Sequence, residues 1–218
     1  MADKNDSRSH WETIYGSRLP SQASWHQDRP DMSLDLIHRA ALPSNSSILD
    51  VGGGASTLVD HVLAEQRYTL TVLDISQVSL AHTRKRLGKV ASRVKWIAAD
   101  VTTWTPDISV DFWHDRAVMH FLSEHANQEA YSRTLKAALR PSGWVLIAGF
   151  APGGPNNCSG LPIVQHDANS LQNLLGPDFA LIETRDESHR TPSGSEQAFR
   201  YHLFRHSAGA SLSSETLI

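Results

Sequence analysis

The 218-residue chain has a single cysteine, no long apolar run and no large excess of charge of either sign. Because Cys158 has no partner, no disulfide forms within the chain, and we expect a reducing, cytoplasmic environment. No stretch approaches the roughly 18–20 apolar residues that span a bilayer, and the first residues lack the apolar core of a secretory signal. A net charge of −3 gives no electrostatic basis for attraction to nucleic acid or to an anionic membrane. We therefore expect neither as a partner.

The chain does have a regular alternation of short apolar runs and amphipathic segments. Apolar runs of five to seven residues are typical of buried parallel strands, and apolar residues spaced three and four apart are typical of helices. Such an alternation predicts a parallel sheet with helices on both faces. Strands are expected at 47–51, 68–73, 93–98, 109–113 and 144–150, and helices at 57–66, 76–87 and 123–139.

The pattern changes after residue 150. Residues 151–160 are rich in proline and glycine and predict a loop, and a short helix is expected at about 168–175. Two β-rich runs follow at 179–185 and 197–205. The segment between them is too short for a crossover helix, so we expect them to pair antiparallel. The sequence therefore predicts an α/β, Rossmann-like fold with a mostly parallel seven-stranded sheet that ends in a C-terminal antiparallel hairpin.

The α/β pattern occupies residues 45–206, which we expect to form one domain. Residues 1–44 precede it, with disorder expected at 1–9 and amphipathic helices at 10–16 and 33–41. Residues 207–218 are rich in serine, alanine and glycine and are expected to be a disordered tail.

The stretch Ile-Leu-Asp-Val-Gly-Gly-Gly at residues 48–54 carries the strongest functional signal. A strand that runs into a glycine turn and then a helix is the first half of a nucleotide-binding βαβ unit. A dinucleotide fingerprint needs a third glycine where this chain has Thr57. Asp50, just before the glycines, would repel a pyrophosphate and suits a ligand with cationic groups, such as S-adenosylmethionine with its ammonium and sulfonium. The turn favours that cofactor over NAD and makes an NAD-linked oxidoreductase the least favoured function.

Two further carboxylates follow the next strands of the expected sheet. Asp74 ends the second strand, 20 positions after Gly54, where an acidic side chain can accept both ribose hydroxyls. Asp100 follows the third strand. The glycine turn, Asp74 and Asp100, in this order and spacing, resemble the cofactor motifs of class I S-adenosylmethionine-dependent methyltransferases over about residues 45–205. This resemblance implies the cofactor S-adenosyl-L-methionine, bound through Asp50, Gly52 and Gly54 at its methionine end, Asp74 at its ribose, and Asp100 and Val101 at its adenine.

The methyl acceptor is expected beside the end of the fourth strand. His114, Asp115 and Arg116 are the densest set of ionisable groups next to an apolar strand, and we take them as the candidate catalytic residues. Alternatively, Asp115 caps the following segment and Arg116 pairs with a surface carboxylate. A thiol acceptor needs only a nearby cation such as Arg116 to hold its thiolate, whereas an alcohol or phenol needs a base, for which His114 or His120 is the candidate.

A second resemblance covers the same strand and the N-terminal segment. Residues 113–117, Trp-His-Asp-Arg-Ala, resemble the Trp-Asp-Arg-Gly/Ala element of thiopurine S-methyltransferase-type enzymes, with His114 as an insertion. Residues 25–27, Trp-His-Gln, and Trp11 match the N-terminal elements of that family. The resemblance implies that this segment is a lid, with Trp25 and Gln27 covering the methyl donor. The turn at 52–56 and residues 189–199 depart from the pattern.

The sequence therefore predicts an S-adenosylmethionine-dependent methyltransferase for a small molecule, with a thiol or another chalcogen favoured as the nucleophile. Two alternatives are a protein lysine methyltransferase and a cofactor-binding module without turnover. The 12 histidines follow neither a His-Glu-x-x-His nor a Cys/His spacing, so no metal site is expected. The sequence does not identify the acceptor, the oligomeric state or a role for Cys158.

Overall fold

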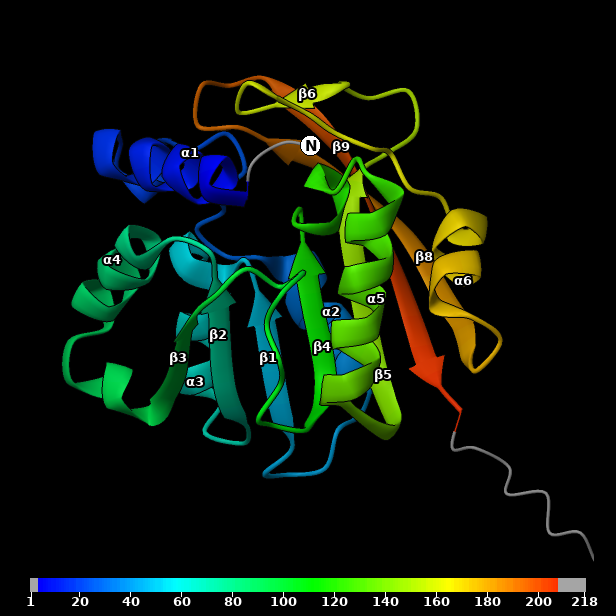
Figure 1. Cartoon of the computed structure of the whole chain (residues 1–218). Helices are drawn as coiled ribbons and strands as arrows, with labels where there is room; N and C mark the ends of the chain where they lie inside the picture. The colour runs from blue at the N-terminus through cyan, green and yellow to red at the C-terminus, as the bar shows by residue number, and fades with distance from the viewer. Residues whose placement is uncertain (1–3, 208–218) are drawn as a thin grey trace, which may run out of the picture.

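The structure is a computed structural model that describes residues 4–207, and its centre is a seven-stranded sheet (Figure 1). The strand order is β3-β2-β1-β4-β5-β9-β8. β1 to β5 are parallel, whereas β9 is antiparallel to both β5 and β8. This arrangement confirms the predicted fold class. The strands are β1 (Ser47–Val51), β2 (Thr69–Asp74), β3 (Val94–Ala98), β4 (Val110–Arg116), β5 (Leu139–Phe150), β8 (Phe179–Arg190) and β9 (Glu196–His206).

Helices cover both faces of the sheet. Two packed clusters of apolar side chains, one on each face, bury the strands from both sides. In Figure 1, α2 and α3 lie behind the sheet, and α5 and α6 lie in front of it. The helices are α1 (Lys4–Ser17), α2 (Asp31–Arg39), α3 (Leu58–Ala64), α4 (Gln77–Leu87), α5 (His125–Ala138) and α6 (Ala168–Leu175).

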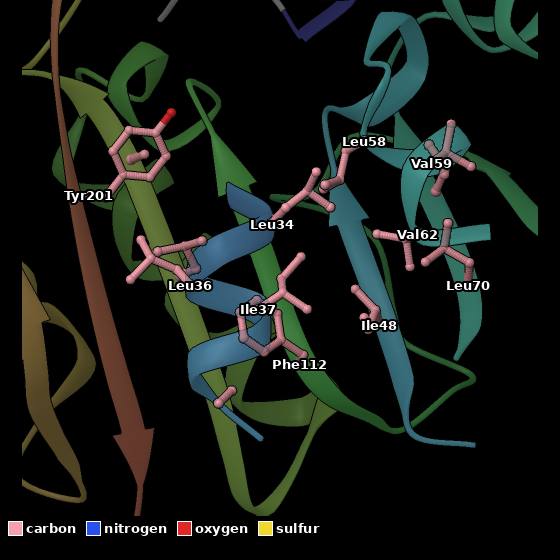
Figure 2. Close-up of a cluster of buried hydrophobic side chains, with 14 of the residues drawn as sticks. Leu34, Leu36, Ile37, Ile48, Leu58, Val59, Val62, Leu70, Phe112 and Tyr201 are labelled. Atoms are coloured by element: carbon pink, nitrogen blue, oxygen red, sulfur yellow. The ribbon is translucent and has the colours of Figure 1, made fainter. Parts of the chain in front are cut away.

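The first cluster joins α2 and α3 to the central strands (Figure 2). Leu34 and Ile37, three residues apart on α2, lie on the same helical face and are fully buried. Ile48 on β1 and Phe112 on β4 meet them from the sheet. This packing fixes the N-terminal helix α2 against the strands whose ends form the site.

The second cluster lies on the opposite face. Alternation along β4 directs Phe112 to one face and Trp113 to the other, where Trp113 packs edge-on against Tyr131 of α5 at a centroid distance of 5.5 Å. Leu135, one turn further along α5, and Leu171 of α6 complete the contact. The alternation along β4 therefore places α5 against the face of the sheet that carries Trp113.

The structure corrects several boundaries. Disorder was expected through residue 9, but α1 begins at Lys4, because packing against α4 and a cluster of aromatic rings supports a helix that local propensity does not predict. β5 begins at Leu139, so residues 141–143 lie within the strand, with Ser142 at φ 59°. The loop at 151–160 contains part of a small antiparallel pair, β6 (Asn157–Cys158) and β7 (Leu161–Pro162).

Residues 208–218 lie outside the described residues, so the predicted C-terminal tail is not addressed. Within residues 4–207, no helix is both long enough and apolar enough to cross a membrane.

Candidate active site

A cavity of about 240 Å³ opens at the carboxyl ends of β1, β2 and β4. Figure 1 shows α1 and β6 above this edge of the sheet, so the cavity lies between the strand ends and these two covering elements. In open parallel sheets, ligands bind at this edge, next to the strand at which the order reverses. Its polar and aromatic lining includes Trp11, Tyr15, Trp25, Asp74, Asp100, Arg116, His120, Phe121, Cys158 and Phe199.

The glycine turn after β1 forms one wall of this cavity. Gly52 has a φ of +69°, and a Cβ atom there would collide with the side chain of Val118. A Cβ atom on Gly54 would collide with Ser79 and lie 2.6 Å from an oxygen of Asp74. The two glycines therefore let the backbone approach the strand ends closely. Gly52 lines the cavity directly, and Gly54 instead supports the turn behind it.

Asp74 connects the turn to the end of β2. Its carboxylate accepts the backbone N–H groups of Gly54, at 2.9 Å, and Ser76, at 2.8 Å, and it also lines the cavity. Each carboxylate oxygen has a second lone pair, so Asp74 can still accept two hydroxyl groups. Burial raises the pKa of Asp74 to about 6. The group predicted to hold the ribose therefore borders the cavity, and its pKa lies close to neutrality.

The third wall follows β3. Asp100 is half-buried, lines the cavity, and accepts the backbone N–H and the hydroxyl of Thr102 at 2.8 and 2.7 Å through one oxygen. Its second oxygen is left for a ligand. Val101 beside it is buried and also lines the cavity. The two residues predicted to hold the adenine therefore lie side by side in the cavity wall.

Asp50 does not face the main cavity. It borders a smaller cavity of about 50 Å³ beneath the N-terminal segment, together with His114 and Ser33. His114 Nδ1 lies 2.7 Å from Asp50 Oδ1, and His114 Nε2 lies 2.9 Å from Ser33 Oγ. Asp50 Oδ2 is buried without a hydrogen-bond partner among residues 4–207. An unpaired carboxylate oxygen beside the glycine turn fits the ammonium group expected there.

His114 is therefore placed differently from the prediction. Both of its ring nitrogens have partners, and its side chain is buried on the Asp50 side of β4, next to the small cavity. A histidine whose lone pair and N–H are both used has no free nitrogen for a methyl acceptor. The structure makes His114 the partner of Asp50 and does not support it as a base.

Asp115 lies on the opposite face of β4 and lines neither cavity. It is fully buried and accepts the backbone N–H groups of Val118 and Met119 and the hydroxyl of Tyr131, at 2.7 to 3.0 Å. Burial raises its pKa to about 6. The alternative interpretation from the sequence, in which Asp115 caps the following segment, matches this geometry, and a contact with the acceptor does not.

Arg116 lines both cavities and ties three parts of the chain together. It donates from Nε to the Tyr201 hydroxyl at 2.8 Å and from Nη1 to the Trp25 carbonyl at 3.0 Å. Its Nη2 lies 3.7 Å from Glu187, and its guanidinium stacks 4.1 Å above the Phe199 ring. The positive charge of Arg116 is thus largely balanced by the hairpin β8–β9.

The N-terminal segment closes over the cavity through aromatic rings. Trp11 packs against Tyr15, Trp25 and Phe121 at centroid distances of 5.0 to 6.0 Å, and all four rings line the cavity. Trp25, predicted to cover the methyl donor, therefore borders the cavity. Gln27 instead donates to Glu187 at 2.9 Å and borders the small cavity, so it anchors the segment to the hairpin.

A carboxylate that the sequence analysis missed fixes α1 in position. Glu12 accepts the Ser76 hydroxyl and the backbone N–H groups of Gln77 and Val78, at 2.8 to 3.1 Å, and so caps α4 from another helix. His189 contributes a second anchor, with Nε2 2.7 Å from the Ser24 carbonyl. These partners lie 64 or more residues apart, so no local pattern in the sequence could have revealed them.

The matched family covers the cofactor side of this site. Residues 48–143 match the family described as "Methyltransferase domain". The chain is 28% identical over 120 residues to trans-aconitate 2-methyltransferase of Azoarcus sp. (strain BH72), which is 55% of this chain and 45% of the relative. It is 29% identical over 130 residues to nodulation protein S of Sinorhizobium fredii (strain NBRC 101917 / NGR234), 60% of this chain and 58% of the relative. The chain thus spans about half the length of these relatives.

A solved structure extends the likeness to the whole fold. The 1,6-didemethyltoxoflavin-N1-methyltransferase of Burkholderia thailandensis, crystallised with 1,6-didemethyltoxoflavin and S-adenosylhomocysteine, superposes with a TM-score of 0.69. The identity is 18%, and the match covers 95% of this chain and 92% of that one. Residues 48–143 therefore resemble a methyltransferase domain, and residues 4–207 share the fold of this solved methyltransferase.

The Burkholderia enzyme was crystallised with S-adenosylhomocysteine, and the cavity walls of this chain suit the three parts of S-adenosylmethionine. Asp74 has free lone pairs for the ribose, and Asp100 has a free oxygen beside the apolar side chain of Val101. The unpaired Asp50 oxygen lies at the glycine turn. Residues 4–207 contain no group of three or more His, Cys, Asp or Glu side chains placed to hold a metal ion.

Proposed function

We propose that this methyltransferase domain transfers the methyl group of S-adenosylmethionine to a neutral nitrogen atom of a small, largely apolar molecule. The observation that carries the proposal is the chemistry of the cavity wall around Trp11, Trp25 and Phe121. This wall is rich in aromatic rings, and burial favours the uncharged forms of two of its titratable groups, His120 and Cys158.

Burial, together with the nearby charge of Arg116, lowers the pKa of His120 to about 3. A basic nitrogen bound at the same place is subject to the same two effects and stays unprotonated at neutral pH. An unprotonated nitrogen keeps the lone pair that attacks a methyl group. The cavity therefore prepares a nitrogen nucleophile without a dedicated base.

The same surroundings disfavour a thiol. Burial raises the pKa of the Cys158 thiol, so a sulfur acceptor beside it would stay protonated and weakly nucleophilic. The prediction of a thiol acceptor depended on a nearby Arg116 to hold the thiolate. The charge of Arg116 does lower the pKa of the Cys158 thiol, but burial raises it by more. The similar solved structure from Burkholderia thailandensis is that of an N1-methyltransferase, which methylates a nitrogen atom.

When bound, S-adenosylmethionine supplies a methyl group that is already activated by its sulfonium. The protein then has to hold donor and acceptor in line and exclude water. Asp74 and Asp100 would fix the nucleoside end, and Asp50 the ammonium. The rings of Trp11, Trp25 and Phe121 would close the cavity over the reacting atoms.

A label-partition assay tests this function. The protein is incubated with S-adenosylmethionine carrying a labelled methyl group and with benzylamine, benzyl mercaptan or benzyl alcohol, which differ only in the nucleophilic atom. We expect labelled benzylamine to exceed the other two products, and we expect the label to be lost in Asp74→Asn but kept in Asp107→Asn, an exposed carboxylate outside the site. A labelled mercaptan as the main product would return the assignment to sulfur.

Two other outcomes assign the alternative functions. If a lysate is added and the label enters one protein band but no small molecule, the domain is a protein methyltransferase. If the cofactor binds and no fraction is labelled, the protein is a binding module without turnover.

A further inference from the structure

The side chain of His120 is deeply buried and has no hydrogen-bond partner among residues 4–207. It lies in the short 3-10 turn Met119–Phe121 that follows β4, and its residue surface is 2% exposed. Neither ring nitrogen has a hydrogen-bond partner among residues 4–207. About 90% or more of buried polar groups in proteins do have one. Two unpaired nitrogens on one ring in a cavity wall therefore indicate a group that a ligand completes.

Packing alone holds this ring in place. His120 packs edge-on against Phe121 at a centroid distance of 4.3 Å and lies 5.4 Å from the Phe150 ring. Gly149 gives it room, because a Cβ atom there would approach the His120 Cβ to 3.3 Å. The backbone carbonyl of His120 accepts the N–H of Val164 at 2.7 Å. The backbone carbonyl thus has a partner, whereas the imidazole in the cavity wall has none among residues 4–207.

We propose that His120 recognises the methyl acceptor through one ring nitrogen, and that the acceptor is a flat, neutral molecule with a hydrogen-bonding atom at that place. A neutral imidazole offers an N–H at one nitrogen and a lone pair at the other; because these point to opposite sides of the ring, one flat ligand pairs with one of them. The aromatic rings around the cavity suit a planar body. This inference rests on the proposed function, because it names the kind of molecule that the domain methylates.

The neighbouring charges argue against a cationic ligand at the same place. Arg116 on β4 and His166 on the segment before α6 are the charged or titratable groups that act on His120, and both disfavour a further positive charge. A purely apolar ligand would leave both imidazole nitrogens unpaired. The site therefore selects a molecule between these extremes, such as an N–H heteroaromatic ring.

The proposal can be tested without turnover by measuring how two matched probes bind to the wild-type protein and to two His120 variants. The probes are benzimidazole, which has an N–H and a ring nitrogen, and indene, which has the same bicyclic shape and neither group. Binding to wild type, His120→Phe and His120→Gln is followed by NMR titration in the presence of S-adenosylhomocysteine. Phe keeps the aromatic packing and removes both polar atoms, whereas the Gln amide keeps one donor and one acceptor.

We expect His120→Phe to weaken benzimidazole binding at least tenfold and to leave indene binding unchanged or tighter. His120→Gln should stay within about threefold of wild type for benzimidazole. Without ligands, His120→Phe should raise Tm by about 2–4 °C, because it removes two unpaired buried nitrogens. A purely structural histidine would show a lower Tm and an equal loss of both probes.

Wild-type benzimidazole affinity in the folded Phe variant would overturn the proposal. Failure of the proposed function has a different signature: no label reaches a nitrogen acceptor in the transfer assay, whatever the probes do. The two tests therefore separate the role of His120 from the reaction itself.

Discussion

The two sides of the main cavity are built in different ways. On the cofactor side, each wall is a strand end and the residues that directly follow it: the glycine turn after β1, Asp74 after β2 and Asp100 after β3. On the acceptor side, the wall combines α1, the segment around Trp25, the end of β4, the β6–β7 pair and the hairpin β8–β9. The first side is encoded locally, and the second depends on contacts between distant residues.

This difference indicates which side can vary. A site at the strand ends needs only the parallel sheet and a few side chains that directly follow its strands. The fold can therefore keep its cofactor site while the acceptor side changes. The acceptor wall is held by individual contacts such as Arg116 to Trp25 and Glu12 to Ser76, which single substitutions can change. We therefore expect substitutions on the cofactor side to affect cofactor binding alone. Substitutions on the acceptor side should alter how the N-terminal segment closes over the cavity, or which acceptor is chosen.

The largest effect is expected at Asp74. Asp74→Asn removes the charge from the group that would accept both ribose hydroxyls while preserving its size. Because hydrogen bonds to charged groups contribute about 1.5–3 kcal/mol each, we expect about 100-fold weaker binding of S-adenosylhomocysteine. Titration calorimetry measures this loss. Asp107→Asn, an exposed carboxylate paired with Lys95, is the matched control and should bind as wild type does. Unchanged affinity in Asp74→Asn would remove the ribose assignment.

A smaller effect is expected from His114→Phe, which should lower the free energy of unfolding. The change leaves the buried carboxylate of Asp50 without its 2.7 Å partner and Ser33 without its acceptor. An unpaired buried polar group costs about 1–3 kcal/mol, so we expect the free energy of unfolding to fall by about 2 kcal/mol. Denaturant unfolding measures it.

The exposed His125 provides the comparison for this variant. His125→Phe should leave the midpoint of unfolding within experimental error. Equal stability of the two variants would mean that the His114 contacts do not support the glycine turn.

The pH dependence of cofactor binding is a second test of the cofactor side, because it follows the charge of Asp74. Burial raises the pKa of Asp74 to about 6, so its carboxylate is ionised above that pH and protonated below it. Protonation removes acceptor capacity, so affinity for S-adenosylhomocysteine should fall as pH falls through 6, by about tenfold between pH 7.5 and pH 5. The fall should be absent in Asp74→Asn. A flat profile in wild type would contradict the role of this carboxylate.

The smallest effect is expected at Glu12, on the acceptor side. Glu12→Gln keeps one acceptor oxygen but loses the charge that caps α4, a change of about 1 kcal/mol or a factor of about five. We expect faster release of bound S-adenosylhomocysteine, measured by stopped-flow fluorescence of the cavity tryptophans. Glu129→Gln, on the exposed surface of α5, should not change the rate.

The parallel sheet and its C-terminal antiparallel hairpin were predictable from the sequence because each strand is a short contiguous pattern. The positions of the turn at 48–54 and of Asp74 at the edge of the sheet were predictable too, since a strand end fixes where the next side chain points. The sequence could not assign Asp115, because its partner Tyr131 comes from α5 on the far face of β4. Glu12 and Glu187 were missed for the same reason.

His120 is an intermediate case. The sequence named it as a candidate base, because a histidine just after the fourth strand is near the reaction. Only the structure shows that it is buried, without polar partners, and next to Arg116. Burial and the absence of partners depend on the whole fold, so they cannot be read from a local pattern.

The central claim is that the cavity delivers a methyl group to a neutral nitrogen. The most direct measurement uses S-adenosylmethionine with a ¹³C-labelled methyl group and follows the methyl signal by NMR during turnover with the matched benzyl acceptors. The account predicts a new N–CH₃ signal that requires Asp74 and grows faster than any other methyl signal. An S–CH₃ or O–CH₃ signal as the main product would contradict it.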